Sequence, residues 1–216
     1  MTKRPAIDPE KTQRIITVAC HEFAASGYRD TKTDVIAAEA NVSKGLLFHY
    51  FKSKANLYLE TVQQTFDKIN AVADWHVWQD APNLQEMVAR ALRYKIALQL
   101  QYPDEFTLAM QAYSASDSLP ASLQPQVQAI WANLLNDSVP LLIDPILKRL
   151  PLRPGVELKT VTRLILSFTN LISEESKAMI QADPHIKIEA FDGIVAETKT
   201  YMDILEHGFL DSNATH

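Results

Sequence analysis

The segment from residue 29 to residue 54, RDTKTDVIAAEANVSKGLLFHYFKSK, constrains the fold of this chain more than any other part of it. It contains two short helical patterns that are separated by a tight turn at residues 40–42. Asn41 in this turn tolerates left-handed backbone angles, and Thr33 and Ser43 stand where the two helices need N-terminal caps. Two short helices joined at a steep angle by such a turn form a helix-turn-helix.

The second of these helices, Lys44 to about Tyr50, has one inward side and one outward side. Leu47 and Phe51 are expected to face inward. The residues expected on or near the outer surface are Lys44, Gly45, Leu46, Phe48, His49 and Tyr50. A cation, a glycine, an imidazole and aromatic rings on one narrow helix are suited to a DNA groove.

The rest of the sequence favours an almost entirely α-helical fold. Apolar residues recur at helical spacing, and only five glycines occur among 216 residues. No glycine-rich phosphate-binding motif and no GxSxG motif is present. The single cysteine, Cys20, is expected to be a small buried hydrophobic residue. We expect about nine helices, with a small domain at residues 1–52 and a larger helical bundle at residues 53–216.

The other helices are predicted from the same periodicity and from glycine and proline positions. Gly27 is expected to stop the first helix with a left-handed backbone angle, and Ser53 is expected to cap the fourth helix. The segment 114–125 is the clearest loop, and Pro140 and Pro145 predict a kink or a break near residues 137–144. The predicted helices are 9–26, 53–79, 83–101, 104–114, one that contains residues 127–135, 156–182 and 186–208.

Charge is distributed unevenly along the chain. Residues 1–56 hold nine Lys or Arg and six Asp or Glu, a net charge of +3, whereas the remaining residues carry −8. A cationic head on an acidic body places the attraction for phosphate at the N-terminal end.

Residues 15–58 resemble the N-terminal domain of the TetR family of bacterial transcription repressors. The matching pattern consists of Phe23, Gly27-Tyr28, Thr31, Thr33, Ile36-Ala37, Val42-Ser43-Lys44-Gly45, Phe48-His49-Tyr50-Phe51, Ser53-Lys54 and Leu57. The resemblance is nearly gapless and covers about the first quarter of the chain. The remaining three quarters match the family only in length and helical character.

The resemblance implies a set of DNA-binding residues. Lys44, Gly45, Leu46 and His49 match groove-facing positions, whereas Thr33, Tyr50 and Lys54 match positions that hold phosphates. Lys32 and Asp34 are further base-reading candidates; Asp34 is unusual at a site that faces phosphates and is better suited to accept from cytosine. Ser43 belongs to this surface as the cap of the helix. Phe48 has two readings of equal weight, a DNA contact or a closure of the domain's core.

The family also implies a dimer and a sensor for a small molecule. The dimer would place two recognition helices on a near-palindromic operator, through a bundle of the last two long helices that includes Leu164, Phe168, Leu171, Phe191, Val195 and Met202. Candidate walls of a pocket for a hydrophobic or aromatic effector are Trp75, Trp78, Tyr94, Phe106, Met110, Tyr113 and Trp131. For each of these aromatic or apolar residues, ordinary core packing is the alternative.

We therefore expect a cytoplasmic, ligand-responsive, DNA-binding regulator, most often a repressor in this family, with no cofactor and no metal. An enzyme is disfavoured. His21-Glu22 begins like a zinc-protease motif, but Ala25 occupies the place of its second histidine. A helical ligand- or partner-binding protein without sequence-specific DNA recognition is the other alternative, and the intact segment from Ser43 to Lys54 argues against it.

Overall fold

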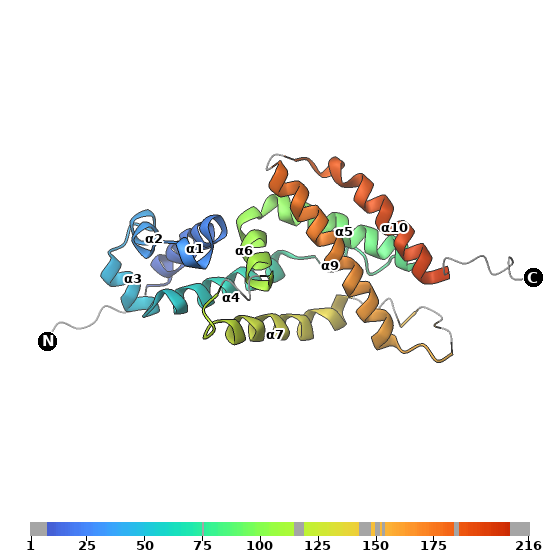
Figure 1. Ribbon diagram of the computed structural model, residues 1–216, viewed down its shortest axis with the longest axis horizontal. Helices are drawn as coiled ribbons and strands as arrows, with labels where there is room; N and C mark the ends of the chain where they lie inside the picture. Colours follow the sequence, from blue (N-terminus) through green and yellow to red (C-terminus); the bar gives the residue numbers. More distant parts are fainter. Residues whose placement is uncertain are drawn as a thin grey trace, which may run out of the picture. The chain divides into compact units, whose positions relative to one another are not determined.

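The computed structural model describes residues 8–74, 76–114, 119–142, 148–149, 152, 154–183 and 186–207. Within these residues the chain is all-α, as predicted, and no helix there is both long and apolar enough to cross a membrane. The elements are α1 (Pro9–Asp30), α2 (Thr33–Glu39), α3 (Lys44–Phe51), α4 (Lys54–Val72), α5 (Leu84–Gln101), α6 (Pro103–Ser114), α7 (Gln124–Leu142), α9 (Leu158–Ala182), the 3-10 helix η1 (Ile188–Phe191) and α10 (Asp192–His207) (Figure 1).

These elements form two compact units. The first unit comprises Met1–Ala73 and Tyr102–Asn136, and the second unit comprises Asp74–Gln101 and Asp137–His216. The predicted domain boundary at residue 52 therefore falls within the first unit, because α4 and α6 both pack against α1. Where the DNA-binding part ends functionally stays a prediction.

Local sequence chemistry sets most helix ends in the first unit. Gly27 has a positive φ of +70°, as predicted, because this backbone region is open mainly to glycine. It interrupts α1 but does not end it, since the helix continues to Asp30. Ser43 Oγ accepts from Leu46 N at 3.1 Å, and Ser53 Oγ accepts from Asn56 N at 3.0 Å. Both predicted caps are confirmed.

Four further predicted details differ from the structure. Thr33 is not a cap: Lys32 holds the N-cap position of α2 and Thr33 is its first helical residue. The fourth helix ends at Val72 instead of about residue 79: Ala73 has an extended backbone, and Trp78 belongs to the core of the second unit. α6 begins at Pro103 itself, which is favoured in the first helical turn.

The prolines of the seventh helix give the fourth difference. α7 continues through Pro140 and ends at Leu142, so this proline lies within the last turn of the helix. Pro145, the other residue behind the predicted kink, lies outside the described residues.

An aromatic cluster closes the core of the first unit. Phe23 is fully buried and meets the Tyr58 ring edge-on with ring centroids 5.0 Å apart, and Tyr28 packs on the same Tyr58 ring at 5.1 Å. Cys20 is buried beside Thr65, and this burial raises the pKa of its thiol to about 11. The expectation of a small hydrophobic cysteine is confirmed.

Two acidic residues in the first turn of α6 connect this helix to α1 and α4. Asp104 Oδ2 lies 2.9 Å from His21 Nδ1, and Glu105 pairs with Lys68. The hydrogen bond to Asp104, followed by the charge of the same carboxylate, raises the pKa of His21. His21 therefore has a structural partner on α6.

The second unit is organised around the packing of α10 on α5 (Figure 1). The sequence predicted that the last two long helices pair with each other, but α10 packs mainly against α5 and touches α9 less. The wide apolar stripe of α10 is consistent with either partner, and the α5 surface supplies matching apolar residues such as Met87, Val88 and Leu92.

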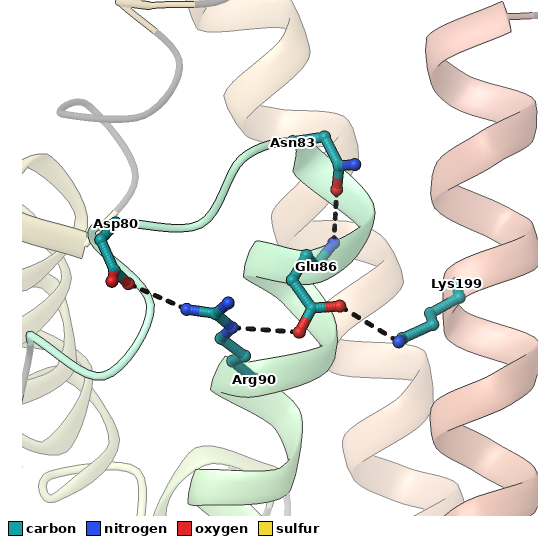
Figure 2. A network of polar contacts seen from close by, with 5 residues as sticks. All are labelled: Asp80, Asn83, Glu86, Arg90 and Lys199. Atoms are coloured by element: carbon teal, nitrogen blue, oxygen red, sulfur yellow. Dashed lines mark hydrogen bonds and ion pairs between the residues drawn. The ribbon is translucent and has the colours of Figure 1, made fainter.

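A network of alternating charges connects α5 to α10 on one side and to the loop before α5 on the other (Figure 2). Arg90 donates to Asp80 at 2.8 Å and to Glu86 at 3.0 Å, and Glu86 in turn accepts from Lys199 at 3.1 Å. Asn83 caps α5 by accepting from the Glu86 backbone N at 2.8 Å. Hydrogen bonds from Arg90 and then Lys199 lower the pKa of Glu86. Exposed ion pairs contribute little individually, so the network mainly fixes the register of the two helices.

Candidate nucleic-acid interface

The turn between α2 and α3 has the geometry that its sequence predicts. Asn41 has a φ of +53°, and Val42 N donates back to Ala37 O at 2.9 Å. Ile36, Ala37, Leu47 and Phe51 are buried and join the two helices to the core. The opposite side of α3 therefore has a fixed orientation and faces outward.

The outward side of α3 consists largely of the predicted groove-facing residues. Lys44 and Gly45 are exposed, and Leu46 and His49 are half-buried. A Cβ built on Gly45 would meet only Ser43 Oγ, at 3.9 Å. The protein itself therefore leaves room for a side chain at this position, and the absence of one leaves the helix backbone open to close approach by a ligand.

Two of the predicted base-reading residues form an ion pair. Lys44 Nζ lies 2.8 Å from Asp34 Oδ1 and 3.0 Å from Asp34 Oδ2, so the first turn of α3 is joined to the first turn of α2. Both side chains are exposed, by 56% for Lys44 and 67% for Asp34. Sequence reasoning named both residues but missed their pairing. The available signal was opposite charges in the first turns of two helices of one motif.

Phe48 and Tyr50 have clear structural roles. Both are half-buried and pack against the core of the first unit. The Tyr50 hydroxyl accepts from Asp8 N at 2.9 Å and so connects α3 to the start of α1. Core closure is thus the supported reading of Phe48, and a phosphate contact from Tyr50 stays a prediction.

Lys54, the predicted phosphate ligand on α4, is also engaged within the chain. Its ammonium donates to the Arg29 carbonyl at 3.0 Å and lies 5.0 Å from the centre of the Tyr28 ring. Burial lowers the pKa of Lys54. The side chain therefore satisfies a carbonyl at the end of α1, a role in which its charge is also favourable. Lys32 is exposed and Thr33 half-buried at the start of α2, on the side of the motif that carries Asp34.

The predicted ligand-binding residues that the structure describes are divided between the two units. Trp78 and Tyr94 lie in the second unit with ring centroids 6.0 Å apart, and the Tyr94 hydroxyl accepts from Asp74 N at 2.7 Å. Trp131 lies in the first unit, where its ring meets Phe66 edge-on at 4.8 Å. Phe106 and Met110 are half-buried in the same unit. Trp75 and the side chain of Tyr113 lie outside the described part of the chain.

Two polar residues on α5 were missed by sequence reasoning. Gln99 is 5% exposed, and its Oε1 has no hydrogen-bond partner among the described residues. Lys95, one turn earlier, is half-buried, and burial lowers its pKa to about 8 against the opposing influence of Glu174. Their signal was a polar side chain at helical spacing from Leu92 and Ile96, where an apolar residue is expected.

The predicted dimer residues divide into two sets. Phe191, Val195 and Met202 are at most 2% exposed, because they already pack within the protomer. They are covered within one chain, and a place for them in a dimer interface stays a prediction. Phe168 is half-buried against Tyr201, with ring centroids 5.6 Å apart. Leu164 and Leu171, by contrast, are 46% and 51% exposed on α9.

Known proteins that are similar in sequence to the helix-turn-helix segment are transcriptional regulators. The uncharacterized HTH-type transcriptional regulator YuxN of Bacillus subtilis is 41% identical over 59 residues, which are 27% of this chain and 20% of YuxN. IcaR of Staphylococcus aureus, a negative transcriptional regulator of the biofilm operon icaADBC, is 36% identical over 59 residues, 27% of this chain and 32% of IcaR. The chain therefore matches at most about a third of the length of these relatives.

A solved structure extends the likeness of fold to most of the chain. The transcriptional regulator FadR from Bacillus subtilis, in complex with stearoyl-CoA, has a TM-score of 0.64 over 92% of this chain and 99% of FadR, at 17% sequence identity. At this identity the likeness concerns the fold alone. The sequence model of the bacterial regulatory proteins of the tetR family matches residues 15–61, the segment that holds the helix-turn-helix. By this match, residues 15–61 are similar to the bacterial regulatory proteins of the tetR family, whereas the likeness of the rest of the chain to known regulators concerns the fold alone.

Proposed function

We propose that this protein is a transcriptional regulator that inserts α3 into the major groove of double-stranded DNA. The observation that carries the proposal is the outward side of α3, which presents Lys44, Gly45 and His49. The buried Leu47 and Phe51 on its inward side hold this helix in place. A lysine reads guanine, a histidine donates or accepts according to its tautomer, and Leu46 offers an apolar surface to a thymine methyl. Backbone approach at Gly45 brings these groups to the base edges.

The regulator acts as a homodimer on a near-palindromic operator. A single helix-turn-helix makes few base contacts, and a dimer places two of them one helical turn of DNA apart, about 34–36 Å. Leu164 and Leu171 support this assembly because they are two helical turns apart on one side of α9 and about half-exposed. Exposed leucines at this spacing form a stripe suited to a second copy of α9.

Selection of bound fragments from a random DNA pool tests the proposed function. We expect enrichment of an inverted repeat whose half-site centres are about 10 base pairs apart. Gel filtration at micromolar concentration is expected to give the mass of two chains. Recovery of no enriched sequence, together with no shift of any pool fragment, would contradict the proposal and favour a helical binding protein without DNA recognition.

We further propose that the protein represses transcription in the cytoplasm until a small hydrophobic or aromatic molecule releases it. Repression follows from an operator that overlaps a promoter, and the similar protein IcaR is a negative regulator. The second unit contains the neighbouring rings of Trp78, which is 6% exposed, and Tyr94, and a buried amide oxygen of Gln99 that has no partner among the described residues. A hydrophobic ligand with a polar end suits this combination. The stearoyl-CoA bound to FadR, which has a similar fold, suggests a first compound to test.

The effector proposal is tested by titrating the protein–operator complex with stearoyl-CoA and, as a matched control, with coenzyme A that lacks the acyl chain. A ligand that lowers operator affinity tenfold must bind the DNA-incompetent state about 1.4 kcal/mol more tightly than the competent one. We expect release by the acylated compound alone. If it binds to saturation while operator affinity stays constant, this class of effector is excluded.

A further inference from the structure

The ion pair between Asp34 and Lys44 is unusual for a surface that has to approach a polyanion. A carboxylate in the first turn of α2 repels DNA phosphates, and it also neutralises the cation at the first residue of α3. Both groups are exposed, so neither is needed to satisfy a buried charge. An exposed pair of this kind changes a folding equilibrium by a factor of about one to five, so stability alone gives little reason for it.

The paired groups present a donor and an acceptor side by side. The ammonium nitrogen and the nearer carboxylate oxygen are 2.8 Å apart. In the major groove, a G·C pair presents guanine O6 as an acceptor and cytosine N4–H₂ as a donor, and these two atoms are about 2.9 Å apart because a base-pairing hydrogen bond joins them. The spacing of the protein pair therefore matches the edge of one G·C base pair.

An A·T pair also presents a donor and an acceptor, but its neighbouring atoms are unfavourable. Adenine N6 lies beside the N7 acceptor, which repels a carboxylate, and thymine O4 lies beside a methyl group. Cytosine N4 has no acceptor next to it in the major groove, and guanine offers both O6 and N7 to the ammonium. Charge and shape thus favour G·C, in the orientation that places cytosine near Asp34.

We propose that Asp34 and Lys44 act as one specificity-determining unit that reads an oriented G·C base pair and lowers the affinity for all other DNA. The inference rests on the proposed function, because it concerns the same helix-turn-helix. On non-operator DNA the Asp34 carboxylate keeps Lys44 from acting as a simple phosphate clamp. At the matching base pair each member finds its own partner, and the penalty is removed.

Asp34→Asn is the decisive variant, because asparagine keeps the size of the side chain but removes its charge and adds a donor. An asparagine amide pairs with adenine N6 and N7, so we expect the selected base at this position to change from cytosine to adenine. We expect the wild-type preference for G·C over A·T, about 5- to 150-fold for one good contact, to fall at least fivefold. Affinity for random-sequence DNA should rise, and the slope of log affinity against log salt should steepen by about 0.9 as Lys44 engages a phosphate.

Glu39→Gln is the matched control, since it removes the same charge from the exposed end of the same helix, α2. It is expected to leave the selected bases unchanged. Lys44→Gln is a second, independent test, which remains available if Asp34→Asn does not fold. This variant should weaken selection at the same base pair. In the double variant, the two losses should be less than additive, because either substitution alone breaks the unit.

The outcomes separate this inference from the proposed function. If wild-type protein enriches an operator and Asp34→Asn selects the same base with the same preference, the specificity unit is wrong while the regulator stands. If the two single substitutions affect different base pairs and combine additively, the residues read DNA independently and the inference also fails. If wild-type protein enriches no sequence at all, the proposed function fails and the inference falls with it.

Discussion

Operator affinity is expected to fall by about 30-fold or more when Lys44 and His49 are both replaced by alanine. Each base contact contributes about 1–3 kcal/mol, so the loss of two contacts costs at least about 2 kcal/mol. Alanine is the best helix former, and both side chains lie on the outward side of α3, so the fold of the motif should persist. Fluorescence anisotropy with the selected operator and with random-sequence DNA measures the effect. Operator binding should fall far more than random-sequence binding.

A matched control replaces Lys11 and His21, one lysine and one histidine on α1, by alanine. Their partners are Asp8 and Asp104, both within the protein, so the substitutions remove similar groups away from the predicted groove. Operator preference should be retained in this control. If Lys44→Ala with His49→Ala leaves operator affinity intact while the protein remains folded and dimeric, α3 is not the recognition helix.

The features that were predictable from the sequence are those that depend on a few adjacent residues. Gly27, Asn41, Ser43 and Ser53 determine helix ends and turns through their own backbone preferences or through a bond to a residue three positions away. The inward positions of α3 follow from the four-residue spacing of Leu47 and Phe51. Each of these interactions involves residues that are at most about one helical turn apart, so it can be predicted from the local sequence alone.

Interactions between distant side chains were not predictable in the same way. Asp34 and Lys44 are ten residues apart, and whether they touch depends on the angle between α2 and α3. Lys54 reaches the Arg29 carbonyl, 25 residues away, so a lysine that the family pattern assigns to phosphate has a partner within the protein. A sequence pattern predicts which side of a helix a residue occupies. Which distant residue its side chain contacts depends on how the helices pack.

The apolar stripes of α9 and α10 illustrate the same limit on a larger scale. Phe191 of η1 and Val195 and Met202 of α10 are buried inside the protomer, where both helices pack on α5. Leu164 and Leu171 are equally apolar but exposed. Hydrophobicity predicts burial, but it does not distinguish burial by the same chain from burial by a second copy.

Replacing both Leu164 and Leu171 by aspartate is expected to dissociate the proposed dimer. Full burial of a leucine side chain contributes about 1.5–3 kcal/mol, and about half of each of these side chains remains exposed in the protomer. Because a twofold dimer contains four such residues, the lost burial amounts to about 3–6 kcal/mol, which weakens dimerisation by about 10²- to 10⁴-fold. Sedimentation equilibrium measures this change. Operator binding should fall in parallel, since a monomer engages only one half-site.

Leu164→Met combined with Leu171→Met is the control at the same two positions. Methionine keeps the apolar surface and adapts to irregular packing, so dimer formation and operator affinity should stay close to those of the wild type. Far-ultraviolet circular dichroism of the aspartate variant should remain helical, because both positions are already exposed in the protomer. An aspartate variant that stays dimeric at the wild-type concentration would exclude this face of α9 as the interface. A subunit contact elsewhere, for example near the exposed Ile204 of α10, would then have to hold the two DNA-binding units together.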